Sequence, residues 1–423
     1  MNQNRLNKSK LRVILNGTGI FCVLVTVFLF FSFSVKAEES LVIVIDPGHG
    51  GENLGAEYGE YTEKDMTMVT AMAMKEELEK YDQVTVYLTH DTDMDMSLEQ
   101  RALFAKEKNA DFLFCLHFNM SDKHDLFGAE VWVPAGGEYY ARGYSFAQIQ
   151  MAELTGIGMY SRGIKTRLND RGDNYYGILR YCSREQVPSV LIEHCHLDHI
   201  KDQKFYQQGE EQLKEFGRLD ALAVAKYFRL RSETLGVDYS DYPVPETTVP
   251  SGMVAPDKTE PELCHIEVAD INKETGEITI NMEAEDSDSY ILYYNYSYDG
   301  GNTYSMPEAW PRTDAWNQSD QTYTFTIKVP FDEQIVLRAG AGNGFDVWTE
   351  SNEIILEIQE EQADSLKIAE TENLEDTARN KDDTAPEIIP VVLIILGIFG
   401  CMFFVAFFMS KMIFQLIRGN KRR

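Results

Sequence analysis

Basic residues are scarce in this 423-residue chain, which has 39 Lys and Arg against 68 Asp and Glu and a formal net charge of −29. Nucleic acids are bound mainly through clusters of Lys and Arg, so a chain this acidic argues against a nucleic-acid partner. The few basic residues are also unevenly placed. Residues 1–36 hold five and residues 411–423 hold another five, and neither end contains an acidic residue. The chain therefore has two basic ends around a strongly acidic body.

Cysteine is scarce as well, with six residues in the whole chain. Cys22 and Cys401 fall in apolar terminal runs, which leaves four scattered cysteines without regular spacing in the body. This pattern does not describe a fold held together by a disulfide framework, although one bridge stays open.

Each basic end adjoins an apolar run. Residues 388–409 are 22 consecutive uncharged residues, long enough to cross a hydrocarbon core of about 30 Å as a transmembrane helix. We expect the basic tail at 410–423 to be cytoplasmic, following the positive-inside rule. Residues 1–37 combine a charged start with a short apolar stretch, as in a signal peptide or an N-terminal membrane anchor. Either reading predicts a protein of the cell membrane whose body lies outside the cytoplasm.

Residues 41–230 alternate between short apolar runs and helical stretches, which predicts an α/β domain with helices on both faces of its sheet. The expected strands are residues 41–45, 84–88, 111–117, 129–133 and 189–193. Helices are expected over 62–81 and 97–109, each opened by a capping box, and over about 202–228.

The character of the sequence changes after residue 230. Residues 231–261 hold five of the 13 prolines and predict an extended linker. Residues 262–358 alternate with a two-residue period, which is typical of a small all-β sandwich of the immunoglobulin or fibronectin kind. Residues 359–387 are polar and acidic and predict a solvated stalk.

Residues able to carry chemistry gather at the ends of the expected strands. The run DPGHGG at 46–51 ends the first strand with His49, Glu63 opens the next helix, and His117 ends the third strand. One strand-end histidine is more often structural than functional. Two imidazoles and a carboxylate on the same side of a sheet, however, are what a three-ligand catalytic zinc site needs.

Glu193 closes the apolar run VLIE at 190–193, with no Lys or Arg beside it. An acid buried at a strand end without a partner is costly, so we expect it to have a role, such as the general base beside a metal site.

The histidine-rich segment that follows is HCHLDH at 194–199. Strand alternation sends His194 and His196 to one face and Glu193 and Cys195 to the other. The spacing lacks the form of a closed zinc site, so a cleft-wall or loop role is expected.

Six segments, in order, resemble the zinc-dependent N-acetylmuramoyl-L-alanine amidases of the third amidase type. They are VIDPGHGG (44–51), EKD (63–65), LTHDTDMDMSLEQR (88–101), CLHFN (115–119), SRG (161–163) and PSVLIE (188–193). The resemblance implies hydrolysis of the amide bond between N-acetylmuramic acid and L-alanine in peptidoglycan. It implies that His49, Glu63 and His117 ligate Zn²⁺ and that Glu193 is the catalytic carboxylate.

The resemblance also implies smaller roles for three neighbours of these residues. Asp46 and Asn119 would hold the ligands in place, and Arg101 would be structural.

Two other functions stay open at this point. One is a catalytically silent peptidoglycan-binding or scaffold module, and the other is a zinc peptidase acting within the stem peptide. Nothing in the sequence identifies a protein activator.

Overall fold

A computed structural model of the chain describes residues 40–312, 319–331, 334–357 and 368–370. The predicted signal or anchor at 1–37, the transmembrane run at 388–409 and the basic tail lie outside these residues. In the part that is described, no helix is both long and apolar enough to span a bilayer.

The first domain contains a six-stranded sheet in the order β4-β1-β5-β8-β6-β7. The strands are β1 (Leu41–Pro47), β4 (Val84–Leu88), β5 (Phe112–Asn119), β6 (Ala129–Trp132), β7 (Ser161–Lys165) and β8 (Ser189–His196). Strand β6 is antiparallel to β8, and the other neighbours are parallel, so the sheet is mixed. All five expected strands are present. Strand β7 was not predicted because its sequence, SRGIK, has no apolar run.

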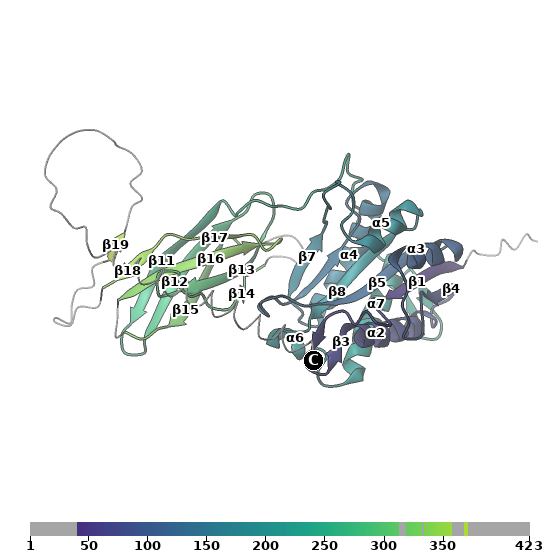
Figure 1. Cartoon of the computed structure of the whole chain (residues 1–423), viewed down its shortest axis with the longest axis horizontal. Coiled ribbons are helices and arrows are strands. Elements are labelled where there is room, and N and C mark those ends of the chain that lie inside the picture. Colours follow the sequence, from purple (N-terminus) through teal and green to yellow (C-terminus); the bar gives the residue numbers. More distant parts are fainter. Residues whose placement is uncertain (1–39, 313–318, 332–333, 358–367, 371–423) are drawn as a thin grey trace, which may run out of the picture. The chain divides into compact units, whose positions relative to one another are not determined.

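Helices cover both faces of this sheet (Figure 1), as the sequence predicted. Helices α2 (Glu63–Leu78), α4 (Gly137–Gly156) and α7 (Glu210–Tyr227) share one core with Phe114 of β5. Helices α3 (Leu98–Glu107) and α5 (Gly177–Arg184) share another with Cys115, the next residue of β5. Successive side chains of a strand point to opposite faces, so this central strand is buried from both sides.

The predicted helix over about 202–228 is divided into two. Helix α6 (Ile200–Gln203) ends early, and α7 begins after Gly209. Gly209 has a φ of 120°, which lies outside the helical range and which glycine adopts most readily. The single long helix was therefore wrong, because the chain turns at this glycine.

A second, all-strand region follows, in which the pairings between strands are antiparallel. One sheet contains β11 (Leu263–Asn272), β12 (Glu277–Glu285) and β15 (Thr322–Lys328). The other contains β13 (Ile291–Ser297), β14 (Glu308–Ala309), β16 (Ile335–Asn343), β17 (Trp348–Glu350), β18 (Ile354–Leu356) and β19 (Ile368–Glu370). Both sheets contribute to one core, for example through Ile280 and Leu337. Strand β19 lies inside the predicted stalk.

The proline-rich segment is packed against the first domain rather than free. It opens with a short hairpin, β9 (Arg231–Ser232) and β10 (Val237–Asp238). Further on, the backbone N–H of Val254 donates to the carbonyl of Ala135 at 2.6 Å, and the Thr166 hydroxyl donates to the carbonyl of Val254 at 2.7 Å.

Tyrosines join the two strand-containing regions. Tyr290 and Tyr293 of the second region form a small buried cluster with Phe127 of the first. The hydroxyl of Tyr290 donates to the backbone carbonyl of Arg162, and that of Tyr293 to the carbonyl of Phe127.

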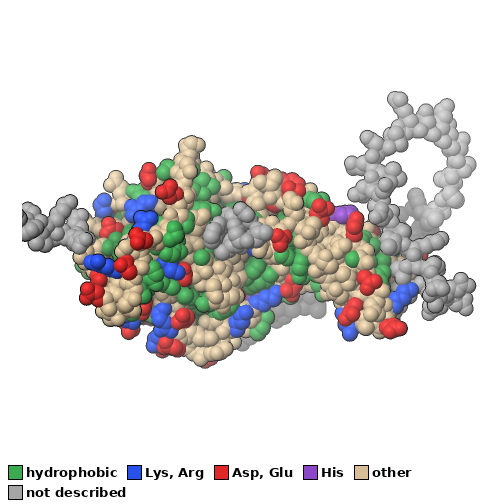
Figure 2. Space-filling view, turned by 180° about the vertical axis from the view of Figure 1, so that it is seen from behind, with side chains coloured by type: hydrophobic (Ala, Val, Ile, Leu, Met, Phe, Trp, Pro, Cys, Tyr) green, Lys and Arg blue, Asp and Glu red, His purple; other side chains and the backbone are tan. Residues whose placement is uncertain are grey.

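Acidic and basic side chains are interspersed over the face shown in Figure 2. This face therefore carries no continuous basic surface of the kind that binds nucleic acid.

Candidate active site

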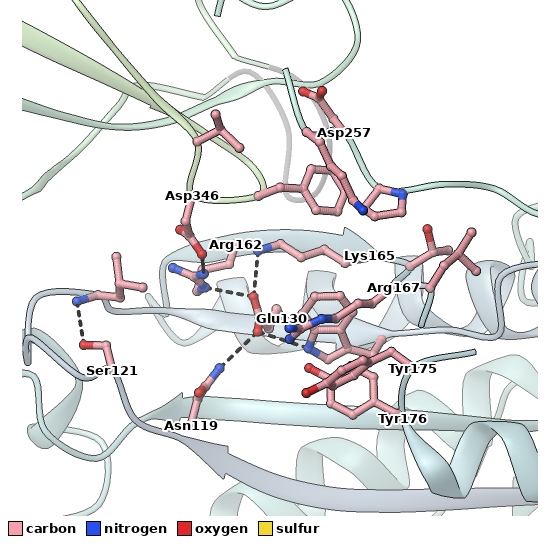
Figure 3. Close-up of a pocket in the computed structure, with 18 of the residues that line it drawn as sticks. Asn119, Ser121, Glu130, Arg162, Lys165, Arg167, Tyr175, Tyr176, Asp257 and Asp346 are labelled. Carbon is pink, nitrogen blue, oxygen red and sulfur yellow. Dashed lines mark hydrogen bonds and ion pairs between the residues drawn. The ribbon is translucent and has the colours of Figure 1, made fainter. Parts of the chain in front are cut away.

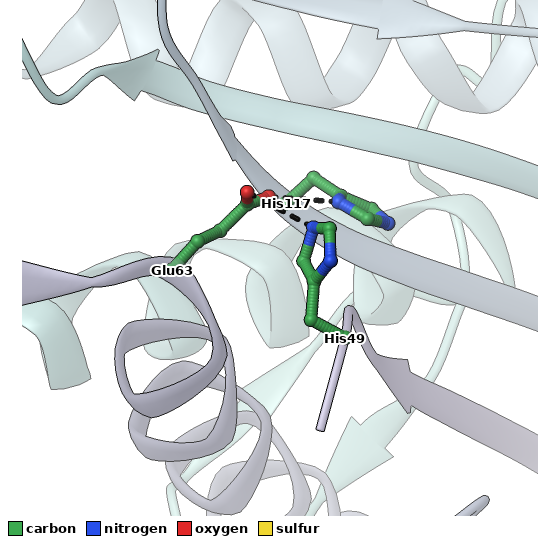
Figure 4. Close-up of side chains that lie close together, drawn as sticks. All are labelled: His49, Glu63 and His117. Carbon is green, nitrogen blue, oxygen red and sulfur yellow. Dashed lines mark hydrogen bonds and ion pairs between the residues drawn. The ribbon is translucent and has the colours of Figure 1, made fainter. Parts of the chain in front are cut away.

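Three elements bring His49, Glu63 and His117 together (Figure 4). His49 lies in the turn after β1, Glu63 is the first residue of α2, and His117 is on β5. One Glu63 carboxylate oxygen lies 2.9 Å from Nε2 of His49, and the other lies 2.8 Å from Nδ1 of His117. One ligand atom from each residue falls within 4.8 Å of the others, so the three side chains can hold one metal ion.

Two glycines make this approach possible. A Cβ atom at Gly48 would lie 2.6 Å from Cε1 of His117. A Cβ atom at Gly55 would lie 2.5 Å from a carboxylate oxygen of Glu63 and 2.7 Å from Cδ2 of His49. His49 itself has a φ of 66°, an uncommon conformation for a residue other than glycine, which is often found at functional sites.

Neighbouring groups hold two of the three side chains, His49 and Glu63, in position. Nδ1 of His49 lies 3.0 Å from the side-chain oxygen of Asn53. In the tautomer with the proton on Nδ1, this group donates to Asn53, and Nε2, which faces Glu63, is the ligand atom. The carboxylate of Glu63 accepts backbone N–H groups from Ala56 at 2.8 Å and Phe118 at 3.0 Å. Sequence reasoning missed Asn53 and Gly55, although both lie within six residues of His49.

The charges of the cluster suit a cation. Burial raises the pKa of Glu63, but the hydrogen bonds to His117 and His49 outweigh it and hold that pKa well below its ordinary range. Burial lowers the pKa of His49, but Glu63 and Asn53 outweigh that effect and raise it. An anionic carboxylate between two imidazoles, with His49 oriented by a second contact to Asn53, is a donor set that fits a zinc ion.

Glu193 lies beside this cluster. It pairs with His117 in the register of parallel strands β5 and β8, and it lines the same cavity of about 690 Å³ as the three ligand candidates. The side chain is 8% exposed, and its Oε2 has no hydrogen-bond partner among the described residues. Burial raises the pKa of Glu193 well above its ordinary value, and the carboxylates of Glu63 and Glu130 raise it further.

Asp46 and Arg101 support the turn that carries His49. Arg101 is 4% exposed and donates to a carboxylate oxygen of Asp46 at 2.8 Å. It also donates to the backbone carbonyls of Pro47, at 2.6 Å, and His49, at 2.5 Å. The structural role implied for Arg101 is thus to fix the backbone around His49.

The position of Asn119 differs from what the resemblance implied. Its side-chain N–H donates to Glu130 at 3.0 Å instead of to a ligand candidate. Glu130 is 2% exposed and also accepts from Trp132 at 3.1 Å, Arg162 at 2.8 Å and Lys165 at 2.7 Å (Figure 3). In the sequence this buried ionic cluster is indicated only by one acidic residue within the short strand β6 and two basic residues within β7.

The alternation expected for the histidine-rich segment fails after Glu193. The register between β5 and β8 shifts there by one extra residue on β8, which is a bulge. His194 points toward Phe118 and Phe216 in the core and bonds Asp220, at 2.9 Å. His196 instead lies against the carbonyl of Gly128, at 3.1 Å. The expectation that the two histidines share a face was wrong because the bulge turns the strand.

The fold and site together define a class: an α/β domain with a mixed sheet and a candidate His-Glu-His metal site at its edge. Comparison with known proteins shows which family this domain resembles. Residues 43–224 match the family model described as N-acetylmuramoyl-L-alanine amidase. The α/β domain of this chain is therefore similar to the N-acetylmuramoyl-L-alanine amidases of the third type.

Several relatives share parts of this domain. The probable N-acetylmuramoyl-L-alanine amidase AmiB of Haemophilus influenzae is 38% identical over 112 residues, which cover 25% of this chain and 26% of AmiB. The N-acetylmuramoyl-L-alanine amidase CwlM of Bacillus licheniformis is 40% identical over 78 residues, covering 18% of this chain and 31% of CwlM. This chain thus spans less than a third of either relative. Among solved structures, Cwp6 from Clostridium difficile aligns at 28% identity with a TM-score of 0.42, over 44% of this chain and 29% of that one.

Proposed function

We propose that this protein is a zinc-dependent N-acetylmuramoyl-L-alanine amidase that cleaves the amide bond between N-acetylmuramic acid and L-alanine in peptidoglycan. The observation that carries the proposal is the convergence of His49, Glu63 and His117 next to the buried carboxylate of Glu193. The match of the α/β domain to the amidase family model indicates that the substrate is peptidoglycan.

In this proposal the three ligand residues hold the ion and Glu193 moves the proton. When bound, zinc supplies Lewis acidity that polarises an amide carbonyl and makes water a better nucleophile near neutral pH. Glu193 accepts a proton from the attacking water and donates it to the departing alanine nitrogen. A raised pKa suits a group that must take up and then release a proton in one turnover.

The test uses the purified body, residues 38–358, and isolated peptidoglycan. We expect new L-alanine amino termini, loss of their release after chelation, and recovery when zinc is added back. A His117→Ala variant should release none and should bind less than one equivalent of zinc by elemental analysis. Amino termini that appear only within the stem peptide would instead identify a peptidase, and no cleavage at all would identify a silent binding module.

We further propose that the protein acts at the cell membrane. The apolar runs at 1–37 and 388–409 and the basic tail at 410–423 support a body held outside the cytoplasm. In the sequence, the second region, as an immunoglobulin- or fibronectin-like sandwich, comes between the enzyme and the apolar run at 388–409. Accessibility of a tag at residue 423 to protease, with and without permeabilised membranes, tests this orientation.

A further inference from the structure

A second cavity, of about 780 Å³, lies beside the candidate active site. Its floor comes from the α/β domain, through residues such as Glu130 and Lys165. Its opposite wall comes from the proline-rich segment at 256–258 and from a loop of the all-strand region at 345–347. The cavity is therefore completed by parts of the chain outside the amidase-family segment.

The two cavities adjoin one another. Five residues line both of them: Asn119, Met120, Arg167, Tyr175 and Tyr176. A molecule with its reacting bond at the His-Glu-His cluster can therefore extend into the second cavity. Arg167 is the cation that lines both spaces, so it stands where such a molecule would pass from one to the other.

Arg167 differs in its contacts from the other arginine of the cavity. Arg162 is buried and neutralised by Glu130 and Asp346, at 2.8 and 2.9 Å. The Arg167 guanidinium is exposed, and its carbon lies 3.8 Å from the centre of the Tyr175 ring (Figure 3). Among the described residues, no carboxylate lies within 4.0 Å of it. In a chain with 68 acidic residues, a cation without an acidic partner at this junction points to an anionic ligand.

The chemistry of guanidinium selects a carboxylate. Stacking on Tyr175 occupies the face of the group, and the Tyr176 hydroxyl is a hydrogen-bond partner at its edge. The other N–H groups of that edge can donate to a carboxylate. The acids Asp122 and Asp170 also line the second cavity and would repel an anion from their own positions. Lys258 is another exposed cation of the second cavity, but it does not line the active-site cavity. A substrate carboxylate close to the scissile amide is therefore favoured at Arg167.

We infer that the second cavity is a subsite for the peptide arm of the substrate, in which Arg167 binds a carboxylate on the peptide side of the scissile amide. This inference rests on the proposed amidase function. The glycan contributes mainly neutral sugar groups, whereas the peptide supplies free carboxylates, so the geometry assigns the peptide to this side.

The test compares two muropeptides that differ only in whether the residue after L-alanine carries a free carboxylate or a carboxamide. We expect wild-type protein to favour the carboxylate form by about tenfold or more in kcat/KM, the usual worth of a charge-assisted hydrogen bond. Arg167→Gln should lower kcat/KM for the carboxylate form much more than for the carboxamide form, so that the preference for the carboxylate form is lost. Arg167→Lys should keep part of the preference.

Arg171 supplies a matched control, because it is exposed in the same loop and lines neither cavity. Arg171→Gln should keep the full preference. An equal preference in wild type and Arg167→Gln would overturn the inference. If neither muropeptide is hydrolysed, calorimetry can compare the affinities of wild type for the carboxylate and carboxamide forms. A preference for the carboxylate form would then support the subsite even though the proposed amidase activity had failed.

Discussion

Glu193 and His117 lie side by side on neighbouring parallel strands, and one Glu193 oxygen has no partner among the described residues. Glu193→Gln keeps the size of the side chain but removes the base. We expect hydrolysis to fall by about 10²- to 10⁴-fold while zinc content stays unchanged. Initial rates and elemental analysis of the same preparation measure both quantities. Glu107→Gln, at an exposed position of α3, is the matched control and should retain wild-type rates.

The pH dependence of kcat/KM should reflect the protonation of Glu193. Because burial and nearby carboxylates raise the pKa of Glu193, it takes up a proton at a higher pH than an ordinary glutamate. The base form is then lost as pH falls, so kcat/KM should decline on the acid side with a midpoint above about 4.3. In Glu193→Gln this acid limb should disappear from the residual activity. A limb that persists in the variant would assign it to another group.

The sequence could predict the ligand candidates because each one follows a strand or opens a helix within a short, distinctive motif. It could not predict how they are supported. The need for glycine at position 55 comes from the close approach of Glu63 and His49, and the role of Asn53 comes from a turn that bends back on His49. Such contacts depend on backbone angles that a residue pattern does not determine.

Among the elements, α2 and α3 give a direct comparison of two predicted capping boxes. Ser97 forms both hydrogen bonds of the box with Gln100, so that prediction is confirmed. Thr62 makes no such bond to the backbone of α2, and its hydroxyl donates to the side chain of Asp65 at 2.5 Å. The box at Thr62 was wrong, because the shorter aspartate engages the hydroxyl itself.

Removing the cap of α3 should therefore destabilise the protein more than removing the Thr62 hydroxyl before α2. Ser97→Ala should lower the free energy of unfolding by about 1 kcal/mol, since it leaves an N-terminal N–H of α3 without its acceptor. Thr62→Ala should cost less than half of that. Urea unfolding of both variants under one condition measures the contrast. Equal losses would show that the two hydroxyls act alike.

The cluster around Glu130 joins β6 and β7. It should make the free energy of unfolding depend on pH in the acid range. Burial raises the pKa of Glu130, but Lys165 and Arg162 outweigh it and hold the pKa well below its ordinary range. The unfolded chain therefore binds this proton at a higher pH than the folded one. The contribution of Glu130 is complete above about pH 4.3 and is lost as pH falls below it.

Glu130→Gln tests this dependence. It should cost about 3–5 kcal/mol at pH 7, because two buried cations lose their shared partner. The loss should shrink as pH falls below about 4.3, and urea midpoints of wild type and variant across that range measure it. A gap that stays constant down to pH 3 would contradict the ionic origin of the effect.

For the whole molecule, the division into an α/β domain and an all-strand region follows from two different hydrophobic periods in the sequence. The contact between the two regions does not follow from these periods. It depends on tyrosine hydroxyls and on Asp346, which reach across from loops and strand edges to Arg162 and Phe127. Nothing local distinguishes those tyrosines from the many others in the sequence, so the sequence could not predict which residues form the contact.

Tyr293 is the residue through which this contact is tested best. Its fully buried hydroxyl accepts from Arg162 at 2.8 Å and from the Phe127 backbone N–H at 3.2 Å, and it donates to the Phe127 carbonyl. Tyr293→Phe removes all three bonds with little change of volume. It should lower the free energy of unfolding by about 2–3 kcal/mol, because a buried guanidinium N–H loses its acceptor.

Tyr298 is 43% exposed and provides the control. Tyr298→Phe should change stability by less than about 0.5 kcal/mol. Calorimetry of residues 38–358 separates the two outcomes. If the two regions unfold as one cooperative unit through this contact, Tyr293→Phe should lower the melting temperature of the α/β domain as well as that of the all-strand region. An unchanged α/β transition would mean that the tyrosine contact does not couple them.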